Sequence, residues 1–166
     1  MSDFNAQEHD HTSNNIANLL AIVGMVLSIA LQMVYFNFFG IINWGDGIVV
    51  GVLAGACILA GFKLGKGVSG KTFPVFLVVI AVLTVVLGVS LGITFLVYNI
   101  GGFTLGEAFL LFFDEYLFAD IQGTTLYHSQ GIIDMGVAIG IAILIVGGKY
   151  FVGRSANKKQ DNSADS

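Results

Sequence analysis

Residues 73–98 read FPVFLVVIAVLTVVLGVSLGITFLVY, and this stretch decides the fold class of the 166-residue chain. It contains no charged side chain and exceeds the roughly 20 apolar residues that an α-helix needs to cross a hydrocarbon core. Thr72 and Pro74 supply the capping hydroxyl and the first-turn proline that are typical of a helix start. We therefore predict a membrane-spanning helix over residues 73–98.

The composition of the whole chain supports a membrane location. Hydrophobic residues make up 55% of the chain, charged residues make up 11%, and the mean hydropathy is +0.84. Charged residues make up about a quarter of an ordinary soluble domain. The net charge of -4 argues against a basic surface that binds nucleic acid. Cys57 is the single cysteine, so it cannot form an internal disulfide or a cysteine-based metal site.

Three more apolar stretches are predicted to cross the bilayer, over residues 16–39, 48–64 and 131–151. The second of them is slightly short, and Lys63 at its end can extend its ammonium group to the lipid headgroups. The sequence therefore predicts an all-α integral membrane protein with four transmembrane helices. The predicted membrane domain covers residues 16–152, between polar cytoplasmic tails at residues 1–15 and 153–166.

The connection between the third and fourth spans is too long for a structureless loop, so we expect part of it to be ordered. Its central segment, residues 104–121, is apolar but carries four carboxylates: Glu107, Asp114, Glu115 and Asp120. A spanning helix would bury these acids at a cost of several kcal/mol each. We therefore predict an amphipathic helix that lies in the membrane interface or packs on the bundle, with its carboxylates on an external acidic face.

The positive charges predict the orientation, because cytoplasmic loops of membrane proteins carry the excess of lysine and arginine. All seven lie on one side of a four-span topology: Lys63, Lys66, Lys71, Lys149, Arg154, Lys158 and Lys159. This distribution predicts a multi-pass protein with both termini in the cytoplasm. The acidic loop then lies outside.

Small residues recur at a four-residue spacing within the spans, a pattern that lets helix backbones approach closely. These positions are Gly47, Gly51 and Gly55 in the second span, Thr84, Gly88 and Gly92 in the third, and Gly136 and Gly140 in the fourth. The first span has a related stripe of Gly24, Ser28 and Gln32. The pattern fits packing within a four-helix bundle, and it also fits a seam between copies of the chain or with another membrane protein.

Two polar side chains inside the spans are candidate functional groups. Gln32 is the strongly polar residue deep in the first span, where an interhelical hydrogen bond or a transport site would explain an amide. Asp134 lies about one turn into the fourth span. Two explanations stay open for this position: a functional carboxylate, or a structural carboxylate that interacts favourably with the helix dipole.

The sequence contains no recognisable motif for catalysis, a cofactor or a metal ion. The external acids lack the alternating ligands, central glycine and final glutamate of a calcium loop. The four predicted spans contain no internal histidine for haem, and the chain has no nucleophile elbow or phosphate-binding loop. We therefore expect a protein without enzymatic activity, cofactor or metal.

One segment resembles known proteins. Residues 51–109, GVLAGACILAGFKLGKGVSGKTF through FTLGEAF, form a helix, a glycine–lysine loop, a second helix and an amphipathic stretch. This arrangement is similar to uncharacterised multi-span membrane proteins of Gram-positive bacteria. The resemblance implies a bacterial plasma-membrane setting, and it transfers no residue roles.

Two functional hypotheses follow from these patterns. The first is a non-enzymatic accessory, scaffold or immunity-type subunit, which lies in the lipid bilayer and acts through helix–helix contacts with its own copies or with another membrane protein. The alternative is a small transporter or channel subunit that functions as an oligomer, with Gln32, Asp134 and Thr84 along its path. Polar side chains deep in the membrane distinguish the two hypotheses, because a permeation route for ions needs such groups.

Overall fold

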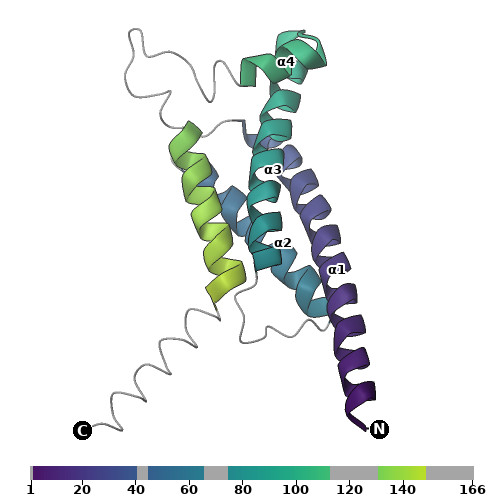
Figure 1. The fold of residues 1–166 in the computed structure, drawn as a ribbon. Coiled ribbons are helices and arrows are strands. Elements are labelled where there is room, and N and C mark those ends of the chain that lie inside the picture. Colours follow the sequence, from purple (N-terminus) through teal and green to yellow (C-terminus); the bar gives the residue numbers. More distant parts are fainter. Residues whose placement is uncertain (1, 41–44, 66–74, 113–130, 149–166) are drawn as a thin grey trace, which may run out of the picture.

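The computed structural model describes residues 2–40, 45–65, 75–112 and 131–148. The described chain forms five helices, which are α1 (Ser2–Phe39), α2 (Asp46–Leu64), α3 (Val75–Gly101), α4 (Leu105–Leu111) and an unlabelled helix over Gly131–Gly148, called helix 131–148 below (Figure 1). Four of them are long and apolar enough to cross a membrane: Asn15–Phe39, Asp46–Leu64, Val75–Gly101 and Gly131–Gly148. The predicted fold class is therefore confirmed, including the short helix between the third and fourth spans.

The helix boundaries differ from the predicted ones by two or three residues in α2 and α3 and by 14 residues at the start of α1. α1 begins at Ser2, so the polar segment 1–15 that we predicted as a tail continues the first span as helical backbone. Residues 2–15 contain no proline or glycine that would end the helix. α3 continues past Tyr98 to Gly101, where Gly102 adopts a φ of 66° and reverses the chain direction.

Part of the prediction lies outside the described residues. α4 covers the start of the predicted amphipathic segment 104–121, whereas residues 113–130 are not described. The same holds for the end of the fourth predicted span, at 149–151, and for the tail at 153–166.

The contacts between helices fix the direction in which each span runs. Gly24 and Gly61 bring α1 and α2 together in antiparallel order, because Gly24 faces Cys57 and Gly61 faces Leu20. α3 runs parallel to α1, and helix 131–148 runs parallel to α2. α4 contacts α3 at the end of the bundle opposite the start of α1, which we call the α4 end (Figure 1).

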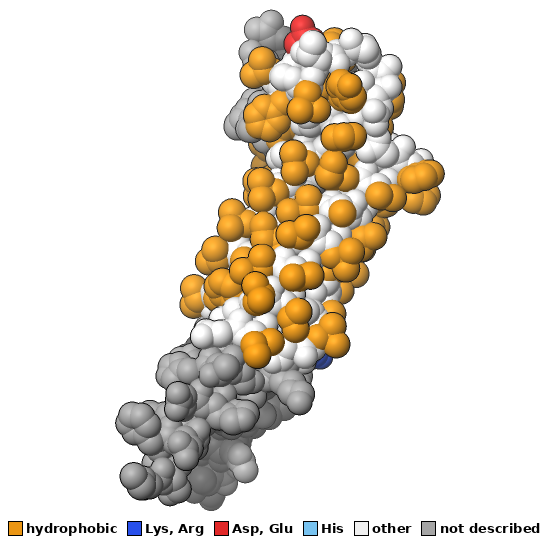
Figure 2. Space-filling view, turned by 90° about the vertical axis from the view of Figure 1, so that its right-hand side faces the viewer, with side chains coloured by type: hydrophobic (Ala, Val, Ile, Leu, Met, Phe, Trp, Pro, Cys, Tyr) orange, Lys and Arg blue, Asp and Glu red, His pale blue; other side chains and the backbone are white. Residues whose placement is uncertain are grey.

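Small side chains occupy much of the core, and many large apolar side chains point outward. Alanine lies where helices cross, and seven described alanines have no exposed surface: Ala17, Ala21, Ala54, Ala81, Ala108, Ala138 and Ala142. Leu19, Val26 and Phe38 are instead more than half exposed. Figure 2 shows hydrophobic side chains over the whole length of one face of the described bundle. This distribution suits a lipid environment, in which an exposed apolar surface costs nothing and close backbone contact provides the packing energy.

Candidate functional site

The glycines of α2 lie against helix 131–148. A Cβ at Gly51 would lie 2.6 Å from the carbonyl oxygen of Ala138, and one at Gly55 would lie 2.8 Å from Cβ of Ile145. Gly47 faces the backbone of Asp134 in the same way. The absence of a side chain therefore lets the two helices touch backbone to backbone at Gly47 and Gly51, and it accommodates the Ile145 side chain at Gly55.

The small residues of α3 lie against α1. Gly88 faces the amide of Gln32, and Gly92 faces the ring of Phe36. Thr84 is fully buried one turn earlier, and its hydroxyl donates a hydrogen bond to the carbonyl of Ile80 in its own helix. The α3 stripe therefore accommodates two large side chains from α1, whereas the α2 stripe accommodates a backbone.

Gly136 and Gly140 have different surroundings from the other predicted packing residues. Both are exposed on helix 131–148, and a Cβ at either position would meet no atom within 4 Å in the described chain. Within the described residues of one chain, these two glycines therefore support no helix contact.

Gln32 is fully buried between α1 and α3. Its Nε2 donates a hydrogen bond of 3.0 Å to Oγ of Ser28, one turn earlier in the same helix. Its Oε1 has no hydrogen-bond partner among the described residues and points at Gly88. The expected interhelical hydrogen bond is therefore replaced by an intrahelical one and by close contact with the Gly88 Cα, of the kind made in weak Cα–H···O interactions.

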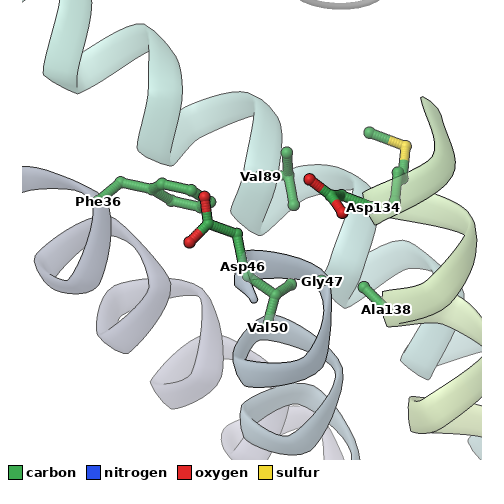
Figure 3. A pocket seen from close by; sticks show the side chains of 8 residues that line it. Phe36, Asp46, Gly47, Val50, Val89, Asp134 and Ala138 are labelled. Atoms are coloured by element: carbon green, nitrogen blue, oxygen red, sulfur yellow. The ribbon is translucent and has the colours of Figure 1, made fainter. Parts of the chain in front are cut away.

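A pocket at the α4 end brings two carboxylates together. Asp46 at the start of α2 and Asp134 on helix 131–148 both line it, and the remaining wall is largely apolar (Figure 3). Asp46 is only 2% exposed, and Oδ1 of Asp46 accepts a hydrogen bond of 2.7 Å from the hydroxyl of Tyr35 on α1. Three spans therefore contribute one polar side chain each to this end of the bundle.

Of these three residues, the sequence patterns single out Asp134 as a candidate functional group and indicate Asp46 only as an acid at the start of the second span, whereas no pattern marks Tyr35. Tyr35 and Asp46 lie on either side of the turn between the first two spans, so an antiparallel pair of helices brings them close. That hairpin geometry is the signal that could have found them. Two carboxylates from different helices can share a proton or attract a cationic group. The part of the chain that the structure describes holds no cluster of three or more His, Cys, Asp or Glu side chains suited to a metal ion.

Glu107 has a structural role at the start of α4. Its carboxylate accepts hydrogen bonds from the backbone N–H and the hydroxyl of Thr104, both at 2.8 Å, and its own N–H donates to the Thr104 hydroxyl. This is a capping box. The bond from the Thr104 backbone, followed by the bond from its hydroxyl, lowers the pKa of Glu107 below its ordinary value. Asp114, Glu115 and Asp120 of the predicted acidic face lie outside the described residues.

The fold and these contacts define an all-helical, multi-span membrane protein. Comparison with protein families, with curated proteins and with solved structures finds no match for this chain.

Proposed function

We propose that the chain is a non-enzymatic accessory, scaffold or immunity-type subunit of a bacterial plasma membrane, acting through helix–helix contacts. The observation that carries this proposal is the position of Gln32. The most polar side chain at mid-span is sealed between α1 and α3, with no exposed surface and with Ser28 and Gly88 as neighbours. An amide in that position packs between two helices and exposes no polar group to a passing solute.

Two hydroxyl side chains of α3 support the same proposal. Thr84 and Ser90 donate to carbonyls one turn earlier in α3, so their hydroxyls are satisfied within their own helix. Neither residue presents a nucleophile next to a base among the described side chains, which supports a protein without enzymatic activity.

The proposed orientation places the α4 end outside and both termini in the cytoplasm. Lys63 is exposed near the end of α2 away from α4, and Glu107 is exposed on α4 at the other end. Positive charge at one end and negative charge at the other supports this orientation, because positive residues concentrate on the cytoplasmic side.

The proposal is tested by the mass of the intact complex after purification in a mild detergent through a C-terminal tag. We expect a mass well above the 17.6 kDa of one chain, together with co-purifying subunits or further copies. Changing both exposed glycines of helix 131–148, Gly136→Leu with Gly140→Leu, should release the single chain without unfolding it, because both positions face open space. Val137→Leu, an exposed neighbour on the same helix, is the matched control.

A measured mass of the wild-type protein that corresponds to a single chain, with no co-purifying subunit, would contradict the proposal. One specific observation favours the second candidate, a small transporter or channel subunit: Asp46 and Asp134 share a pocket at the α4 end. A homo-oligomer without another subunit that conducts cations in vesicles, and loses this flux on Asp134→Asn, would replace the accessory-subunit proposal with this second one.

A further inference from the structure

The last turn of α3 and the segment that follows it present apolar side chains outward. Ile100 at the end of α3 is 77% exposed, and Leu110 on α4 is 63% exposed. Phe103 and Leu105, between these two, are also exposed. An exposed apolar cluster of this kind indicates a contact surface.

The depth of this cluster follows from the length of α3. The helix has 27 residues with Gly88 at its middle, and the half from Gly88 to Gly101 rises about 20 Å. Half of a hydrocarbon core is about 15 Å, and the headgroup layer adds roughly 5–7 Å. With α3 centred in the bilayer, the turn at Gly102 and the start of α4 lie within the headgroup layer.

The direction of α4 keeps it at that depth. The positive φ of Gly102 turns the chain, and α4 bends away from the axis of α3 (Figure 1). Ala108 and Phe112, one turn apart, are buried, which fixes the face of α4 that packs on the bundle. Leu105 and Phe109, four residues apart and both exposed, therefore lie on one flank of α4, whereas Leu110 lies on the side away from the packed face.

We propose that α4 and the turn before it, residues 100–111, form a lipid-docking element that lies in the headgroup layer and inserts Leu105 and Phe109 toward the acyl chains. The apolar surface is continuous with the lipid-facing side of α3, where Leu91, Phe95 and Tyr98 are exposed in succession. Figure 2 shows this continuity, with hydrophobic side chains reaching from the spans to the α4 end and acidic atoms only near its tip.

The capping box allows a helix as short as α4 to form in this layer. Backbone groups without partners are costly wherever water is scarce, and Thr104 and Glu107 satisfy two N–H groups at the helix start. Glu107 is itself exposed, and as the charged side chain of α4 it belongs on the water-facing side.

The test uses tryptophan fluorescence, because Trp44 is the single tryptophan of the chain. In a Trp44→Phe background, Phe109→Trp and, separately, Leu105→Trp place one reporter on α4. Each protein is reconstituted into phosphatidylcholine nanodiscs, where iodide reaches both faces. Leu91→Trp, at a lipid-facing position of α3, is the control for a reporter in the acyl region.

We expect phosphatidylcholine with brominated acyl chains to lower the emission of both α4 reporters by roughly twofold or more, as expected for side chains buried at the acyl boundary. Quenching by brominated lipid supports the proposal, with or without partial quenching by iodide. Quenching by iodide alone would place α4 in water and overturn it. Quenching by neither reagent would show that protein covers this surface and would also overturn it.

Discussion

The glycines of α2 and those of helix 131–148 share one spacing but not one environment. Gly47, Gly51 and Gly55 meet the backbone or side chains of the neighbouring helix, whereas Gly136 and Gly140 on that neighbour face open space. The two helices touch each other, so the difference arises from which face of each helix is turned inward. Ala138 and Ala142, and not the glycines, form the inner face of helix 131–148.

This comparison shows what a spacing of small residues establishes in a membrane helix. The spacing defines a face that another backbone can approach closely. It does not decide whether protein or lipid covers that face, because both are apolar. Whether the face is filled depends on the rotation of the helix about its axis. That rotation is set by the rest of the interface, including the carboxylate of Asp134 at the pocket.

The largest expected effect is the loss of stability on Gly51→Ala. The new methyl group would lie 2.6 Å from the Ala138 carbonyl oxygen and 3.0 Å from its Cα, so the two backbones must separate. Overpacking of this kind costs about 1–3 kcal/mol. The measurement is the free energy of unfolding in a mild detergent that maintains the folded chain.

Gly140→Ala is the matched change on the facing helix. It fills open space and replaces glycine with a better helix former, so we expect no loss and a gain of up to about 1 kcal/mol. Equal losses for the two variants would remove the distinction between the filled and the unfilled glycine face.

The α1–α3 contact offers a smaller effect, because a side chain and not a backbone fills the space beside the glycine. A methyl group at Gly88 would occupy the position of Gln32 Oε1, and the amide must move. We expect Gly88→Ala to cost about 1 kcal/mol in the wild-type background and much less in a Gln32→Ala background, a coupling that a double-mutant cycle measures.

Gly92→Ala provides the control for this cycle. Gly92 faces Phe36 and not Gln32, so its cost should add to that of Gln32→Ala without coupling. Additive costs for Gly88→Ala and Gln32→Ala would show that the Gln32 amide does not pack against Gly88 in the detergent-solubilised protein.

The spans could be predicted from the sequence because each is a long apolar run with a clear end. The predicted range 48–64 begins two residues after the start of α2 and ends at the same residue. The predicted range 73–98 begins two residues before α3 and ends three residues before it does. A span is recognised by its length and by its lack of charged residues, and both can be read from one continuous stretch of sequence. The start of α1 was less predictable, because polarity marks the end of a span but does not end a helix.

The contacts around the candidate site could not be predicted because they depend on pairs of helices. The Tyr35–Asp46 hydrogen bond joins residues of different spans, and its length is set by how α1 and α2 cross. Gly61 lies close to α1, although it belongs to none of the small-residue stripes that we identified. Sequence periodicity describes one helix at a time, whereas these positions are defined by the neighbour.

The smallest expected effect is at α4, where Glu107 has a local partner and no packing against another helix. Its pKa is lowered because the Thr104 N–H and hydroxyl favour the ionised carboxylate. A lowered pKa in the folded state means that the cap is at full strength above the ordinary value of 4.5 and weakens as the pH falls through the lowered pKa. We expect the NMR shift of the Thr104 amide in nanodiscs to titrate with a midpoint below 4.5.

Glu107→Gln distinguishes the titration of Glu107 from the titration of other acids. Glutamine can accept the same two hydrogen bonds at this position of a capping box, but it does not ionise. The Thr104 amide shift should then stay constant over the same pH range. A midpoint at or above 4.5 in the wild type would mean that the two bonds from Thr104 are not maintained in the bilayer. The start of α4 would then resemble the open glycine face of helix 131–148, defined by its sequence pattern but without the contact that the pattern permits.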